Sequence, residues 1–122
     1  MGTRFINTTE SKAPDSYRDM IVAAGASDVV YTASISGVHA NFLAASLQAA
    51  GITEEDLRKD VKIDFGKELD TEAKAWKTIW SAGQGVALID NVCSVEELVG
   101  TLKTEFKTAI SEQIKLLETY SN

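Results

Sequence analysis

The stretch AWKTIWSAGQGV, residues 75–86, contains both tryptophans of this chain and runs directly into a Gly-X-Gly turn. Trp76 and Trp80 are four residues apart, so they would share one face of a helix. Gly83 and Gly85 leave the backbone free to adopt positive φ angles and to approach a ligand closely. We therefore expect a helix that ends in this glycine turn. A helical tryptophan pair is more often core packing than a platform for a ring-shaped cofactor.

Length and composition are those of one globular domain. The 122 residues are 44% hydrophobic and 25% charged, which is enough apolar material for a modest core. The formal charge of −6 argues against nucleic acid as a partner, because phosphate backbones bind basic surfaces. Cys93 is the single cysteine, so an internal disulfide is excluded and a reducing compartment is favoured. With no apolar leader and no membrane-length apolar run, we expect a cytoplasmic protein without a membrane partner.

The hydrophobic pattern along the chain predicts more helix than strand. Gly25 and Gly51 stand where helices would end, and Pro14 stands where one would begin. Asn41 or a neighbour can cap the helix that precedes Gly51. Strands are expected at residues 3–7, 28–32 and 86–89, and helices at residues 14–24, 42–50, 53–56, 70–80 and 95–117.

The last third of the chain carries the clearest helix signal. Ser94 and Glu97 have the spacing of a capping box, in which each side chain bonds the backbone N–H of the other residue. Charged residues occupy one face of the helix behind them. The other face is a continuous apolar stripe: Val95, Leu98, Val99, Leu102, Phe106, Ala109, Ile110, Ile114 and Leu117. If nothing covers this stripe, self-association of the chain is expected.

Two short motifs give the chain a family resemblance. Residues 1–5 read MGTRF, and residues 80–85 read WSAGQG, ahead of the long final helix. In this order the three features resemble the nitronate monooxygenases, which are FMN-dependent (β/α)8 enzymes once called 2-nitropropane dioxygenases. The resemblance extends from Met1 to about Phe106. It implies oxidation of alkyl nitronates to a carbonyl compound and nitrite, with a small-molecule nitronate and O2 as partners.

The resemblance also implies an α/β fold, here the carboxy-terminal part of an FMN-binding (β/α)8 TIM barrel with its small substrate-side domain. A whole barrel needs about 250 residues, so we expect a fragment that is mostly helical in isolation. Residues 1–122 would form a single partial domain. Residues 1–12 would be the last barrel strand and its exit, residues 13–69 a small insertion domain, and residues 70–122 the return to the barrel and its closing helix.

By the same resemblance, Met1, Gly2 and Thr3 contact the FMN phosphate, since glycine backbone and a threonine hydroxyl can both donate to its oxygens. Gly83 and Gln84 would lie on the cofactor side of the glycine turn. From the residues alone, plainer interpretations are favoured. Met1 and Gly2 can be a simple translation start, and the glycine turn can be a simple helix end.

Candidate catalytic groups are few. His39 is the only histidine. The family's histidine base lies in an upstream region that this chain lacks, so we interpret His39 as a residue at the start of a helix. Cys93 has no histidine near it in sequence to activate it as a nucleophile. No carboxylate spacing suggests a metal site. We therefore expect neither a catalytic residue nor a metal ligand in this chain.

The chain lacks the family's first barrel strands and its Gly-Gly phosphate loop, so we expect weak or absent FMN binding by the chain alone. Two further interpretations stay open. A sister group of similar architecture consists of FMN-dependent enoyl-acyl-carrier-protein reductases, and the chain could be a fragment of one of these. Alternatively, it is a small helical interaction module, unrelated to flavin, that buries its final apolar stripe against a partner.

Overall fold

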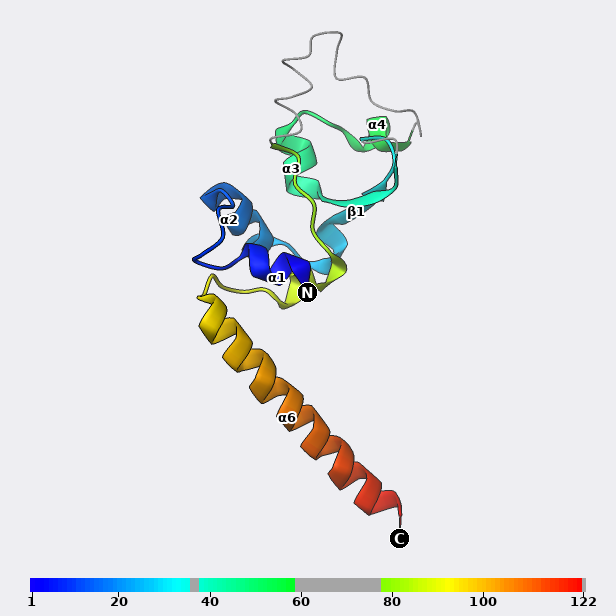
Figure 1. Ribbon diagram of the computed structural model, residues 1–122. Helices are drawn as coiled ribbons and strands as arrows, with labels where there is room; N and C mark the ends of the chain where they lie inside the picture. Colours follow the sequence, from blue (N-terminus) through cyan, green and yellow to red (C-terminus); the bar gives the residue numbers. More distant parts are fainter. Residues whose placement is uncertain (36–37, 59–77, 122) are drawn as a thin grey trace.

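The computed structural model describes residues 1–35, 38–58 and 78–121. Figure 1 shows a folded body and one long helix, α6, that projects away from it toward the C-terminus. The described residues are mostly helical, as expected, with one two-stranded sheet. In chain order the elements are α1 (Gly2–Ile6), α2 (Asp15–Ala23), η1 (Ala26–Asp28), β1 (Val29–Thr32), β2 (Ala40–Leu43), α3 (Ala44–Ala49), α4 (Glu54–Arg58), η2 (Gln84–Leu88) and α6 (Val95–Tyr120).

The sheet is an antiparallel hairpin of β1 and β2, whose register places Val29 opposite Leu43. β2 leads directly into α3. At Gly51, just beyond α3, the backbone has a φ of +79°, which favours glycine. The N–H groups of Gly51 and Ile52 bond back to carbonyls of α3 in a Schellman ending. The prediction that Gly51 ends this helix is confirmed.

Within the described part of the chain, the core has two apolar clusters on opposite faces of the hairpin. Phe42 and Leu43 are neighbours on β2, so they point to opposite faces and belong to different clusters. The first cluster is buried between the sheet, α2 and η2 and contains Ile21, Leu43, Ala82, Val86 and Ile89. The second involves β2 and α3 and contains Ile35, Phe42, Leu47, Ile52 and Ile79.

Residues 79–82 run beside β2 and connect the two clusters. The Leu43 N–H donates to the Trp80 carbonyl oxygen at 2.8 Å. The fully buried Ser46 hydroxyl accepts from the Trp80 N–H at 3.0 Å and donates to the Leu43 carbonyl oxygen at 2.8 Å. Tyr17 stacks on Trp80 with ring centroids 4.8 Å apart. Trp80 therefore packs within the body.

Two strand predictions are wrong. Residues 3–7 were expected to be extended, but α1 occupies Gly2–Ile6. Residues 86–89 were also expected to be extended, but they fall in the 3-10 helix η2 and its end. There Val86 and Ile89 are both buried, and the three-residue spacing between them is the repeat of a 3-10 helix. A short apolar run does not distinguish helix from strand, which explains both errors.

The predicted helix at 42–50 begins later than expected. Phe42 and Leu43 belong to β2, because they pair with β1, and α3 starts only at Ala44. Asn41 is therefore a strand residue and not a helix cap, and His39 precedes a strand and not a helix. By contrast, α2, β1 and α4 lie close to their predicted positions. Most of the helix predicted at 70–80, including Trp76, lies outside the described residues.

The predicted capping box at the start of α6 is confirmed. The Glu97 N–H donates to the Ser94 hydroxyl oxygen at 3.2 Å, and the Ser94 N–H donates to the Glu97 carboxylate at 2.8 Å. The Glu10 carboxylate, from the loop after α1, accepts from the Val95 N–H at 3.0 Å. Three backbone N–H groups at the start of α6 are thereby satisfied by side chains.

Among the residues that the structure describes, only the first turns of α6 contact the body. Leu98 is buried, and Leu102 is partly covered, whereas Phe106 and the apolar residues after it are exposed. The predicted apolar stripe is thus present as a helix face but largely uncovered. Of the helices that the structure describes, none is long and apolar enough to cross a membrane.

Candidate functional site

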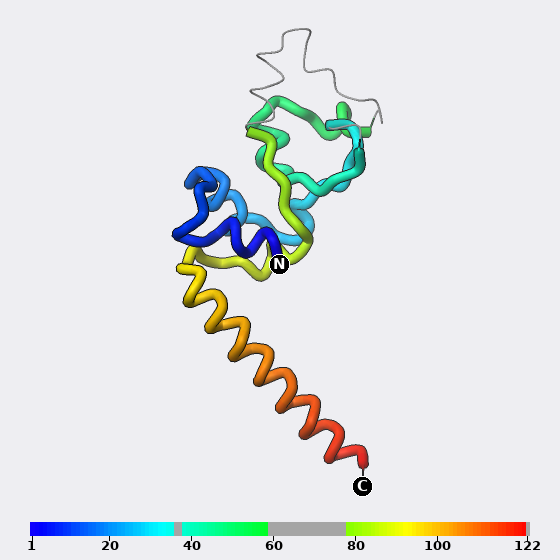
Figure 2. The backbone as a smooth tube through the Cα atoms, in the orientation of Figure 1, coloured from blue at the N-terminus to red at the C-terminus, as the bar shows by residue number. Residues whose placement is uncertain are grey.

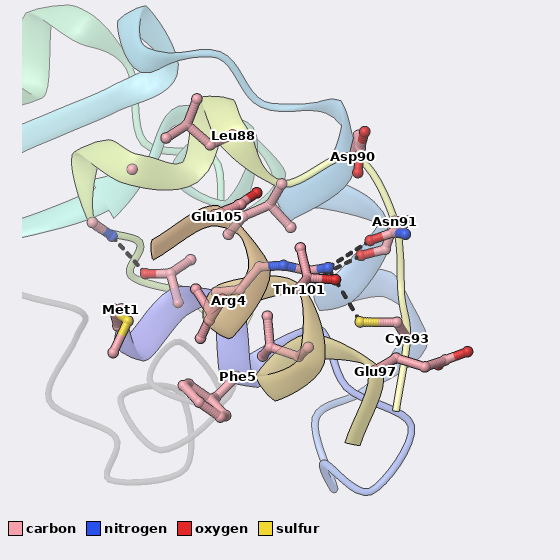
Figure 3. Close-up of a pocket in the computed structure, with 16 residues that line it drawn as sticks. Met1, Arg4, Phe5, Leu88, Asp90, Asn91, Cys93, Glu97, Thr101 and Glu105 are labelled. Atoms are coloured by element: carbon pink, nitrogen blue, oxygen red, sulfur yellow. Dashed lines mark hydrogen bonds between the residues drawn. The ribbon is translucent and has the colours of Figure 1, made fainter. Parts of the chain in front are cut away.

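A pocket of about 810 Å³ lies between α1, the segment 83–93 and the first turns of α6. We call it the α1 pocket. Met1 and Thr3 line it at the start of α1, and Gly83 and Gly85 line it at the glycine turn. Figure 3 shows side chains from all three segments converging on this space. The two motifs of the family resemblance therefore meet at one site.

Thr3 and Gly83 make the direct contact between the two motifs. The Gly83 N–H donates to the Thr3 hydroxyl oxygen at 2.9 Å, across a sequence separation of 80 residues. A Cβ added at Gly83 would lie 3.5 Å from that same oxygen, an ordinary contact distance. The Gly83 amide is thus already used within the chain. The Thr3 hydroxyl, having accepted a hydrogen bond, keeps its own hydrogen for another acceptor.

Three of the five predicted cofactor residues line the α1 pocket: Met1, Thr3 and Gly83. Gly2 and Gln84 are exposed and do not line it. Gln84 opens η2 with its backbone, so it contributes to the turn and not to the pocket wall.

Arg4 is a pocket residue that the sequence prediction missed. Its guanidinium donates to the Asn91 carbonyl oxygen at 3.1 Å and to the Asn91 side-chain oxygen at 2.6 Å. It also donates to the Cys93 sulfur at 3.2 Å, as the dashed lines in Figure 3 show. Backbone bonds between Cys93 and residues 7–9 run alongside. The MGTRF motif, which contains Arg4, was the sequence signal that could have identified this residue. No sequence signal pointed to its partner Asn91, 87 residues away.

Charge is unevenly distributed around the α1 pocket. The Arg4 guanidinium reaches from α1 to Asn91 and Cys93, Asp90 precedes these residues, and Glu97 and Glu105 belong to α6. A hydrogen bond from the Ser94 backbone N–H holds the pKa of Glu97 below its usual value, so this carboxylate is ionised near neutrality. Glu97 and Glu105 therefore disfavour an anionic ligand group beside α6.

Two other polar aromatic side chains, His39 and Tyr17, do not line the α1 pocket. His39 stacks on Tyr31 with ring centroids 4.9 Å apart, in the hairpin region, and does not line the α1 pocket. The Tyr17 hydroxyl donates to the Ser81 carbonyl oxygen, while burial of the ring raises the pKa of Tyr17. Across the described ranges, no three His, Cys, Asp or Glu side chains are grouped to hold a metal ion.

The chain is similar to a protein named nitronate monooxygenase from Paraburkholderia phytofirmans. The two are 32% identical over 120 residues, which cover 92% of this chain and 32% of the relative. This chain therefore spans about a third of the length of the relative it matches, as a carboxy-terminal portion of such a protein would. No protein-family profile and no solved structure matches it. The resemblance inferred from the sequence is confirmed at this level.

Proposed function

We propose that this chain forms part of an FMN-dependent enzyme that oxidises an alkyl nitronate with O2, and that the start of α1 binds the flavin phosphate. The hydrogen bond between the Gly83 N–H and the Thr3 hydroxyl carries the proposal, because it joins the two segments on which the resemblance rests. The name of the Paraburkholderia relative supplies the reaction class. Because the chain spans only about a third of the relative's length, other segments would complete the site.

The residues at the start of α1 suit a phosphate group. The first N–H groups of a helix have no carbonyl partner within it, and anions bind there. Gly2 is exposed, and a Cβ at Gly2 or Gly85 would meet no atom within 4 Å, so space is open beside both. The remaining hydrogen of the Thr3 hydroxyl adds a donor. Glu97 and Glu105 disfavour a phosphate beside α6.

The proposal also places the segments of this chain within a barrel. Because residues 2–6 are the helix α1, they would follow the last barrel strand and not form it. Residues 13–69 would be the insertion domain, and residues 70–122 the return and the closing helix. In this arrangement α1 begins at the strand end, where barrel enzymes bind phosphate.

In this proposal, the residues of this chain bind FMN and hold the pocket wall in position. FMN, when bound, supplies the electron transfer between substrate and O2. Arg4 fixes the segment 91–93 against α1 and so keeps the pocket wall in place. His39 lies away from the pocket. A proton-abstracting base would therefore come from a part of the enzyme outside the region that this chain shares with its relative.

The chain alone is expected to bind FMN weakly or not at all and to leave nitronates unchanged. Flavin fluorescence titration measures the binding, and oxygen uptake with propionate 3-nitronate measures turnover. Micromolar FMN affinity together with turnover by the 122-residue chain would refute the view that it is an incomplete site.

A chimera tests the function itself. This chain replaces the matching segment of the Paraburkholderia relative, and FMN retention and nitronate-dependent oxygen uptake are measured. In the chimera, Thr3→Val should weaken FMN binding about tenfold, because it removes one hydrogen-bond donor to the phosphate. Thr101→Val makes the same change on the α6 side of the pocket and should leave FMN affinity unaltered. A folded chimera that excludes FMN would contradict the proposal.

A further inference from the structure

We draw no further inference here: the strongest candidate, the apolar face that α6 exposes from Phe106 to Leu117 beyond the body (Figures 1 and 2), carries none, because nothing in the described part of the chain shows what covers it.

Discussion

The Glu10 carboxylate and the Val95 backbone N–H meet at 3.0 Å across the junction between the body and α6. This hydrogen bond is the main reason that the pKa of Glu10 lies below its ordinary value of 4.5. The Ser94 N–H lowers the pKa of Glu97 in the same way. Two ionised carboxylates therefore stabilise the positive end of the α6 dipole while they satisfy its first N–H groups.

Acid should weaken the junction between the body and α6. Because the pKa values of Glu10 and Glu97 are lower in the folded chain than 4.5, their stabilisation is complete above that pH. It is lost as the pH falls through the lowered folded values. Glu10→Gln should therefore speed exchange of the Val95 amide at neutral pH and flatten the acid dependence of urea unfolding. If Glu96→Gln, in the same helical turn, has an equal effect, the Glu10 bond is not the cause.

The Thr3–Gly83 bond should protect one amide. Thr3→Val removes the acceptor and should lower the free energy of unfolding by about 1 kcal/mol. Hydrogen exchange measured by NMR should show faster exchange at Gly83. Thr3→Ser keeps the hydroxyl and should keep the protection. An unchanged Gly83 exchange rate in Thr3→Val would contradict the bond.

The buried Ser46 hydroxyl should be costly to remove. Ser46→Ala leaves the Trp80 N–H without its partner inside the core, and we expect a loss of about 1–3 kcal/mol in urea unfolding. Ser16→Ala makes the same change at an exposed position of α2 and should cost less than about 0.5 kcal/mol. Equal losses for the two variants would show that Ser46 does not hold residues 79–82 beside β2.

Two glycines should respond to alanine with opposite signs. Gly51 has a φ of +79°, so Gly51→Ala should destabilise the chain by about 1–2 kcal/mol. Gly100 lies inside α6, and a Cβ there would meet no atom within 4 Å, so Gly100→Ala should stabilise by up to about 1 kcal/mol. Thermal unfolding of both variants measures the contrast. A destabilising Gly100→Ala would mean that the start of α6 is more closely covered than the structure indicates.

Local chemistry made part of the fold predictable. Ser94 and Glu97 cap α6 through groups three residues apart, and Gly51 ends α3 through its own φ, so the short sequence spacing contains the information. α1 and β2 were mispredicted because distant partners decide them. Arg4 anchors α1 to Asn91, and β2 is an extended strand because it pairs with β1 and borders residues 79–82.

The candidate site shows the same division. Met1, Thr3 and Gly83 could be expected at one site, because a family resemblance already links their two motifs. The bonds from Arg4 to Asn91 and Cys93 could not, because no repeat or spacing relates residues so far apart in sequence. The sequence likewise did not indicate that Gly2 and Gln84 lie outside the pocket wall.

Met1 lies on the wall of the α1 pocket, whereas the last residues of α6 lie at the far end of the molecule. A purification tag or fluorescent fusion attached ahead of Met1 would therefore crowd the pocket mouth and could mimic a failure of ligand binding. The same tag placed after Asn122 would leave the pocket accessible. Flavin titrations should therefore use a carboxy-terminal tag, and the tag should be removed before the oligomeric state is measured.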